Sequence, residues 1–148
     1  MSEKAPLIHV GITVTSIDKF VEFYGKYFGF ELRMRGVFPE EFIAGTPELY
    51  KLKAGAYSDF AFLDSPNGIA LELFQFNELL PAEQAIWNKP GYHHLCLRVA
   101  SVPELYEKMA ADGVEFYFPP KPMGDSGAFW VFFKDPDGNM IELQDTKK

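Results

Sequence analysis

The feature that most constrains this chain is an internal repeat. Serines (Ser16 and Ser101) and glycines (Gly29 and Gly113) recur at matched places around an amphipathic stretch in each copy. An opening and a closing segment also occur twice: "HVGITV" (9–14) and "HLCLRV" (94–99), then "SPNGIALEL" (65–73) and "DPDGNMIEL" (135–143). Repetition over this distance indicates that one supersecondary unit occurs twice in the chain.

The spacing of the two copies locates an insertion in the first. Gly29 and Gly113 are 84 residues apart, whereas Pro66 and Pro136 are 70 residues apart. The first copy therefore carries about 14 extra residues between Gly29 and Pro66, and we expect them within residues 36–59.

Each copy has the periodicity of a strand, a helix and about three further strands. Apolar residues alternate in residues 9–14, as in a strand with one buried face, and then recur at helical spacing over residues 17–28. In the second copy, Ser101 and Glu104 have the spacing of a capping box at the start of a helix. Strands are expected at residues 9–14, 30–36, 59–64, 69–76, 94–99, 114–120, 128–133 and 140–145. The pattern predicts an α+β fold of tandem βαβββ modules with mostly antiparallel pairing.

The chain length of 148 residues is that of one domain. We expect a first module at residues 7–76, a linker at 77–92 and a second module at 93–145. Within the linker, residues 82–87 are predicted to form a short helix. The Pro-Asn-Gly and Pro-Asp-Gly turns are predicted to form hairpins.

Composition excludes several classes of partner. The formal net charge of −7 argues against binding to nucleic acid or to anionic membranes. No apolar stretch approaches the roughly 20 residues needed to span a bilayer, and residues 1–6 lack the apolar region of a signal peptide. Cys96 is the only cysteine, which excludes an internal disulfide and a thiolate metal cluster. A cytoplasmic protein with a small-molecule substrate is expected.

Four potential metal ligands recur at equivalent positions: His9 and His94 near the start of each copy, Glu72 and Glu142 near its end. Alternation places each opposite the apolar face of its strand. A single histidine or glutamate on a strand is usually structural or solvated, but the repetition favours a ligand set. Two imidazoles and two carboxylates suit an octahedral divalent ion such as Ni, Co, Mn, Fe or Zn.

These motifs closely resemble those of the vicinal oxygen chelate superfamily, which includes glyoxalase I, over about residues 7–145. The resemblance implies two modules whose curved sheets surround a cleft, with one divalent metal ion held by His9, Glu72, His94 and Glu142. His93 adjoins this set, but alternation turns it to the other face, so we expect a secondary role.

The resemblance also implies the chemistry. A chelated divalent ion stabilises the charge that develops when a neighbouring C–H bond loses its proton. Glu142 and Glu72 are then the candidate proton carriers of a glyoxalase-like lyase or isomerase acting on a small 2-oxo or 2-hydroxy compound. Three alternatives stay open: a methylmalonyl-CoA-type epimerase, an Fe(II) extradiol dioxygenase, and a non-catalytic drug- or metabolite-binding protein of the bleomycin-resistance type.

The glutathione-binding residues of glyoxalase I have no good match. Thr13 stands where an arginine is common, Phe76 stands where an asparagine is common, and residues 123–129 lack the expected basic residue. We therefore expect a more apolar substrate. The candidate substrate-binding residues are Phe74, Phe76, Trp130 and Phe132, whose alternative role is core packing, and Arg98, whose alternative is a solvated strand end.

The resemblance further implies a homodimer. Whether one chain or two build each site is left open at this stage, as is the role of Cys96.

Overall fold

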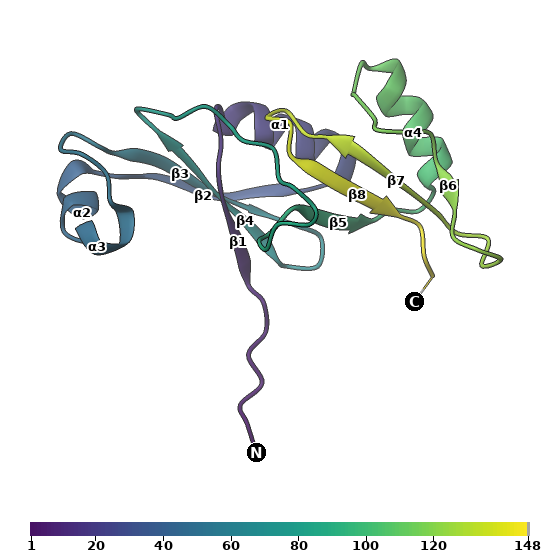
Figure 1. Cartoon of the computed structure of the whole chain (residues 1–148), viewed down its shortest axis with the longest axis horizontal. Coiled ribbons are helices and arrows are strands. Elements are labelled where there is room, and N and C mark those ends of the chain that lie inside the picture. Colours follow the sequence, from purple (N-terminus) through teal and green to yellow (C-terminus); the bar gives the residue numbers. More distant parts are fainter. Residues whose placement is uncertain (148) are drawn as a thin grey trace. The chain divides into compact units, whose positions relative to one another are not determined.

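Each copy of the repeat forms a four-stranded sheet with a helix, in a computed structural model that describes residues 1–147 (Figure 1). The first copy contains β1 (His9–Thr13), α1 (Ile17–Phe28), β2 (Glu31–Phe38), α2 (Glu40–Ala44), α3 (Pro47–Tyr50), β3 (Ser58–Asp64) and β4 (Ala70–Phe76). The second contains β5 (His94–Arg98), α4 (Val102–Ala111), β6 (Lys121–Pro122), β7 (Phe129–Lys134) and β8 (Met140–Gln144).

The two sheets have the same topology. Their strand orders are β1-β4-β3-β2 and β5-β8-β7-β6. The first strand of each copy pairs in parallel with the last, and the other pairs are antiparallel. The predicted α+β class with mostly antiparallel strands is confirmed.

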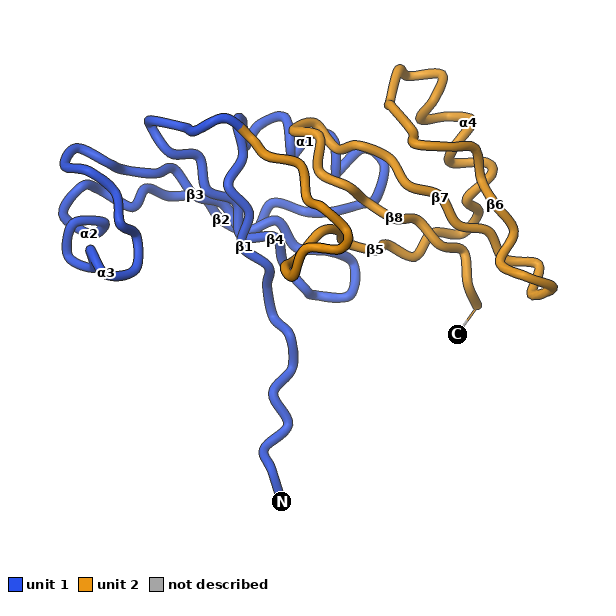
Figure 2. Tube along the Cα trace, viewed as in Figure 1, with its two compact units in different colours: residues 1–81 blue, residues 82–148 orange. Residues whose placement is uncertain are grey.

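The chain divides into two compact units, Met1–Pro81 and Ala82–Lys148 (Figure 2). In the first unit, α1 packs against β2, β3 and β4. In the second, α4 packs against β7. Each helix therefore covers one face of its own sheet. The most deeply buried side chains are Val14, Ile17, Phe20, Tyr24, Leu63 and Leu73 in the first unit, and Val102, Met109, Val131, Phe133, Ile141 and Leu143 in the second.

Both long helices begin at a serine cap, which was predicted for Ser101. Ser16 and Ser101 each accept a hydrogen bond through their hydroxyl from the backbone N–H three residues later, at 3.3 Å in both cases. Gly29 ends α1 in the left-handed conformation at φ 69°, which glycine adopts without steric cost.

A second pair of side chains, which sequence reasoning missed, also ties each helix to its sheet. Gln75 accepts a hydrogen bond from the N–H of Ile17 at 2.8 Å, and Asp145 accepts one from the N–H of Val102 at 2.9 Å. Each of the two lies three positions after the glutamate of its own copy, Glu72 or Glu142, so the offset of the repeat was the available signal.

The two Pro-x-Gly segments close β3–β4 and β7–β8 hairpins, as predicted. The insertion in the first copy also lies where the spacing placed it, because α2 and α3 fall between β2 and β3. Phe42 of α2 stacks on Phe38 of β2 with ring centroids 4.8 Å apart.

Two local predictions are wrong. A strand was expected over residues 114–120, but one isolated bridge, between Phe116 and Phe133, forms there, and the short strand β6 follows it. The cause is Pro119-Pro120, which lacks the N–H donors that a ladder needs.

Residues 82–87 are not helical. All six residues are exposed, so a short helix here would gain little packing to stabilise it. Within residues 1–147, no helix is long and apolar enough to cross a membrane.

Candidate metal and substrate site

In the first unit, two of the candidate ligands, His9 and Glu72, form a pair. His9 begins β1 and Glu72 lies in the middle of β4, and the parallel pairing sets Gly11 beside Glu72. His9 Nε2 lies 3.1 Å from Glu72 Oε2. Both side chains project from the face of the sheet opposite Leu71 and Leu73, which are buried.

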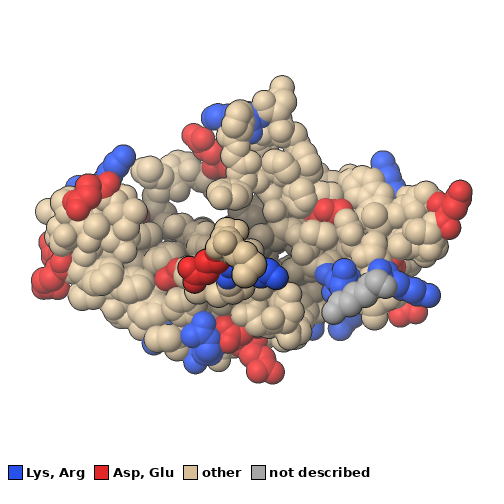
Figure 3. Space-filling model, turned by 90° about the horizontal axis from the view of Figure 1, so that it is seen from below, with Lys and Arg blue, Asp and Glu red and all other residues tan. Residues whose placement is uncertain are grey.

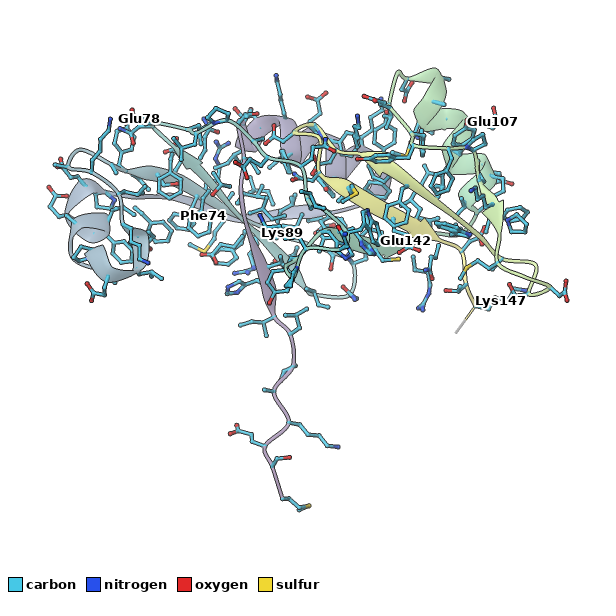
Figure 4. All side chains as sticks on the ribbon, in the orientation of Figure 1. Phe74, Glu78, Lys89, Glu107, Glu142 and Lys147 are labelled. Carbon is cyan, nitrogen blue, oxygen red and sulfur yellow. The ribbon has the colours of Figure 1, made fainter. Side chains whose placement is uncertain are left out.

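The second unit repeats this pair. His94 begins β5, Glu142 lies in the middle of β8, and His94 Nε2 lies 3.1 Å from Glu142 Oε2. Glu142 is labelled in Figure 4. Its other carboxylate oxygen, Oε1, accepts a hydrogen bond from Gln144 Nε2 at 2.7 Å. Both oxygens of the Glu142 carboxylate therefore have a partner.

The donor atoms of each pair fit a divalent metal ion. Adjacent ligands at about 2.1 Å from an octahedral ion lie about 3 Å apart, which is close to the separation in both pairs. Imidazole nitrogen and carboxylate oxygen are also donors that such ions accept. No group of three or more His, Cys, Asp or Glu side chains is placed to hold a metal among the described residues, so each unit by itself offers two ligands.

Phenylalanine rings cover the open face of the first sheet beside His9 and Glu72. We call this cluster the phenylalanine face; its members are Phe38 of β2, Phe60 and Phe62 of β3, and Phe74 and Phe76 of β4. Phe74 is labelled in Figure 4. The ring of Phe38 stacks on Phe60 at 4.3 Å and on Phe74 at 5.9 Å, and Phe62 meets the His9 ring edge-on at 5.8 Å.

Gly36 allows this packing. It pairs with Phe60 across β2 and β3, and a Cβ atom at Gly36 would lie 2.6 Å from Phe60 Cε1. The Phe60 ring therefore lies directly over the backbone of Gly36, a position that no side chain at residue 36 would permit. Sequence reasoning missed this role, because a glycine within a strand signals a close approach without naming the partner.

Aromatic residues also lie beside the His–Glu pair of the second unit. The register pairs Phe132 with Glu142, and the Phe132 ring meets His94 edge-on at 5.0 Å. Trp130 packs edge-on against Phe118 at 5.0 Å. Trp130 and Phe132 therefore share the face of Glu142.

The histidine that precedes β5 corrects a prediction. His93 was expected on the opposite face from His94, but their rings stack at 4.8 Å, and the two Nδ1 atoms lie 2.7 Å apart. Alternation fails because His93 lies outside the strand, where no pleat constrains its direction. Trp87, which sequence reasoning did not single out, covers both rings at 4.1 and 5.2 Å.

Cys96 and Arg98 also share the face of Glu142, since β5 pairs them with Glu142 and Gln144. Loss of hydration, together with the negative charge and hydrogen bonding of Glu142, raises the pKa of the Cys96 thiol to about 12. Although Cys96 is exposed, its thiol is therefore protonated at neutral pH and is a poor nucleophile. Arg98 is exposed.

Charged side chains of both signs form small separate groups on the face drawn in Figure 3.

Comparison with known proteins establishes the family. The model of the Glyoxalase/Bleomycin resistance protein/Dioxygenase superfamily matches residues 7–143. The chain belongs to this superfamily. The resemblance inferred from the repeat is thereby confirmed.

Two of the relatives that match this chain are named as enzymes. The chain is 29% identical over 139 residues to a lactoylglutathione lyase of Arabidopsis thaliana, covering 92% of this chain and 42% of that protein. It is 33% identical over 142 residues to a 2-epi-5-epi-valiolone epimerase of an Actinomyces species, covering 91% of this chain and 76% of that protein. The chain thus spans less than half of the plant enzyme and about three quarters of the bacterial one.

Solved structures share the fold. A glyoxalase family protein from Bacillus cereus matches with a TM-score of 0.79 at 20% identity over 97% of both chains. The fosfomycin resistance protein FosX from Listeria monocytogenes, solved with Mn(II) and sulfate, matches with a TM-score of 0.61 at 19% identity over 98% of this chain and 95% of that one.

Proposed function

We propose that this protein is a divalent-metal-dependent lyase or isomerase of the glyoxalase type, which moves a proton at a carbon next to a carbonyl group. The observation that carries this proposal is the repeated His–Glu pair with a 3.1 Å separation in both units. In the proposal, His9, Glu72, His94 and Glu142 together hold one ion of Ni, Co, Zn, Mn or Fe. The family membership supports a common role for the two pairs.

A bound divalent ion would polarise two adjacent substrate oxygens and stabilise the negative charge left by removal of a neighbouring proton. The two glutamates are the groups of this chain that can carry that proton. Their surroundings differ, because Gln144 and His94 engage both oxygens of Glu142, whereas the contact of Glu72 is with His9 through Oε2. We therefore assign the proton transfer mainly to Glu72 and an anchoring role mainly to Glu142.

The proposed substrate is a small 2-oxo or 2-hydroxy compound with an apolar substituent. The phenylalanine face flanks the first His–Glu pair, and Phe132 flanks the second. Phe76 and Thr13 occupy places where glutathione-using relatives commonly carry polar or basic residues, which argues against a glutathione-linked substrate. Arg98 is proposed to bind a carboxylate or phosphate on the substrate, since it is exposed on the face of Glu142.

An epimerase is the second candidate. It is favoured by the Actinomyces relative, an epimerase that is 33% identical over most of its own length. The same residues would serve, because an epimerase also removes and returns a proton at one carbon.

The test begins with metal content. Purified protein stripped of metal should bind close to one equivalent of a divalent ion per complete site, and His9→Ala and His94→Ala should each weaken that binding. A panel of 2-oxo and 2-hydroxy compounds, a glutathione hemithioacetal and methylmalonyl-CoA should then be incubated in D₂O and followed by NMR. Deuterium incorporation that is lost in Glu72→Gln supports proton transfer, and inversion of configuration identifies an epimerase.

Three outcomes would contradict the leading proposal. Failure to bind any divalent ion, with unchanged behaviour of His9→Ala, would exclude the metalloenzyme and favour a binding protein. Consumption of oxygen with a catechol and Fe(II) would favour a dioxygenase. Preferred turnover of the glutathione hemithioacetal would overturn the proposed substrate class.

The proposed homodimer allows a separate experiment. If two chains build each site, mixing His9→Ala with His94→Ala chains creates one intact site per mixed dimer and restores metal binding. If one chain builds its own site, mixing restores nothing. Light scattering under the same conditions gives the oligomeric state.

A further inference from the structure

His93 and His94 form a hydrogen-bonded pair of imidazoles at the start of β5. Their Nδ1 atoms are 2.7 Å apart, which requires one ring to donate and the other to accept. The rings stack with an interplanar angle of 21°, and Trp87 covers both of them. Phe132 meets His94 edge-on from β7. The His94 ring is therefore held by contacts on several sides as well as by a bond to its Nδ1.

The position of the proton on His94 depends on what its other nitrogen does. A ring nitrogen that binds a metal ion carries no proton, so ligation through Nε2 requires the proton of neutral His94 to be on Nδ1. That Nδ1–H can donate only to an acceptor, and the atom within reach is His93 Nδ1. His93 then carries its own proton on Nε2.

Without a metal, the same contacts support the opposite arrangement. His94 Nε2–H can donate to Glu142 Oε2 at 3.1 Å, while His93 donates its Nδ1–H to His94 Nδ1. Both arrangements keep the hydrogen bond between the two Nδ1 atoms with neutral rings in the same places, and the metal-free one also keeps the bond from His94 Nε2–H to Glu142. The pair can therefore change tautomer without moving either ring.

We propose that His93 is a positioning residue that orients His94 and accepts a hydrogen bond from its Nδ1–H, and that it thereby strengthens the binding of a divalent ion by His94. This inference rests on the proposed metal-binding role of His94. Partners of this kind fix the orientation of a ligating imidazole and raise its basicity. The inference goes beyond the proposed function because His93 is not itself a metal ligand in that proposal.

The repeat provides a comparison within the same chain. Ile8 stands before His9 at the position equivalent to that of His93, and it is exposed and has no ring nitrogen. The two halves thus have the same ligand pair but differ in this supporting residue. Replacing His93 by isoleucine would give the second half the composition of the first.

The experiment measures Zn²⁺ affinity by competition with a chelator for the whole chain and for three variants. His93→Ile should weaken binding about 10- to 100-fold, as loss of such a partner typically does. His93→Gln keeps an acceptor oxygen and should recover part of the loss. Tyr92→Ile changes the exposed neighbouring residue and should leave the affinity unchanged.

A second measurement reads the tautomer directly. Imidazole ¹⁵N spectra should show the His94 proton on Nδ1 in the Zn²⁺-loaded protein and on Nε2 in the metal-free protein. In His93→Ile, the metal-free preference of His94 should weaken, because the bond to Nδ1 is lost. Circular dichroism confirms that each variant is folded.

The two proposals fail differently. If the unsubstituted chain binds no Zn²⁺, the proposed function fails, and the metal-dependent inference fails with it, whatever the metal-free spectra show. If the unsubstituted chain binds Zn²⁺ but folded His93→Ile binds it equally well, the role of His93 is overturned while the metal site stands. A proton on Nε2 of His94 in the loaded protein would also overturn it.

Discussion

Asp145 and Gln75, the side chains that tie each helix to its sheet, should contribute unequally to stability. The two occupy equivalent places in the repeat but accept different numbers of hydrogen bonds. Asp145 accepts hydrogen bonds from the N–H groups of Val102, at 2.9 Å, and Phe129, at 2.5 Å. Gln75, at the equivalent place, accepts one from the N–H of Ile17. Removing Asp145 therefore leaves two backbone donors without their partner, whereas removing Gln75 leaves one.

The magnitudes follow from the bond types. A hydrogen bond to a charged group contributes about 1.5–3 kcal/mol, and a neutral one contributes about 1 kcal/mol. Asp145→Ala should then lower the free energy of unfolding by about 3 kcal/mol or more, and Gln75→Ala by about 1 kcal/mol. Asp145→Asn retains an acceptor oxygen but not the charge, so its cost should lie between the two.

Urea denaturation measures these differences. With a slope near 2 kcal/mol per molar, the midpoint should fall by roughly 1.5 M for Asp145→Ala and roughly 0.5 M for Gln75→Ala. Trp87 and Trp130 both lie in the second unit, so tryptophan fluorescence reports there, and far-UV circular dichroism reports on both units. Equal midpoints for the two alanine variants would refute the reasoning, as would an Asp145→Asn variant as unstable as Asp145→Ala.

Three further predictions test other features. Gly36→Ala should displace the Phe60 ring and lower the free energy of unfolding by about 1–3 kcal/mol. It should also raise KM for substrates with aryl groups more than for substrates with small alkyl groups. Equal changes in KM would contradict the role of the phenylalanine face. In the metal-free protein, Cys96 should react slowly with iodoacetamide from pH 7 to pH 9, because partial loss of hydration and Glu142 raise the pKa of its thiol to about 12 and leave little thiolate. Glu142→Gln should speed the reaction, and a rate like that of a free thiol would refute this. Ser101→Ala should cost about 1 kcal/mol, checked by thermal unfolding, and no change would show that the cap is not needed.

Much of the fold could be predicted from local patterns. Alternation located most strands, and the helical spacing and the Ser101 cap located α1 and the start of α4. The failures occur where local pattern and backbone chemistry conflict. At residues 114–120 the apolar alternation suggested a strand, but two prolines removed the donors that continuous pairing needs.

The candidate site was predictable only in part. Phe132 and Arg98, which were expected to bind substrate, do lie on the same face of the second sheet as Glu142, because pleating is a property of each strand. Alternation misplaced His93, since the rule stops at the end of a strand. The coverage by Trp87 was not predictable, because the ring comes from an irregular segment whose path depends on packing.

The sequence by itself determined that two equivalent modules exist, that each carries a histidine and a glutamate at matched positions, and that both point away from the buried face. These are local properties, set by repetition and by the period of a strand. Only the tertiary structure decided that each histidine meets the glutamate of its own copy, because the parallel pairing of first and last strands brings together residues far apart in the chain. The same packing made the two pairs unequal, by setting Phe62 against His9 and both His93 and Trp87 against His94.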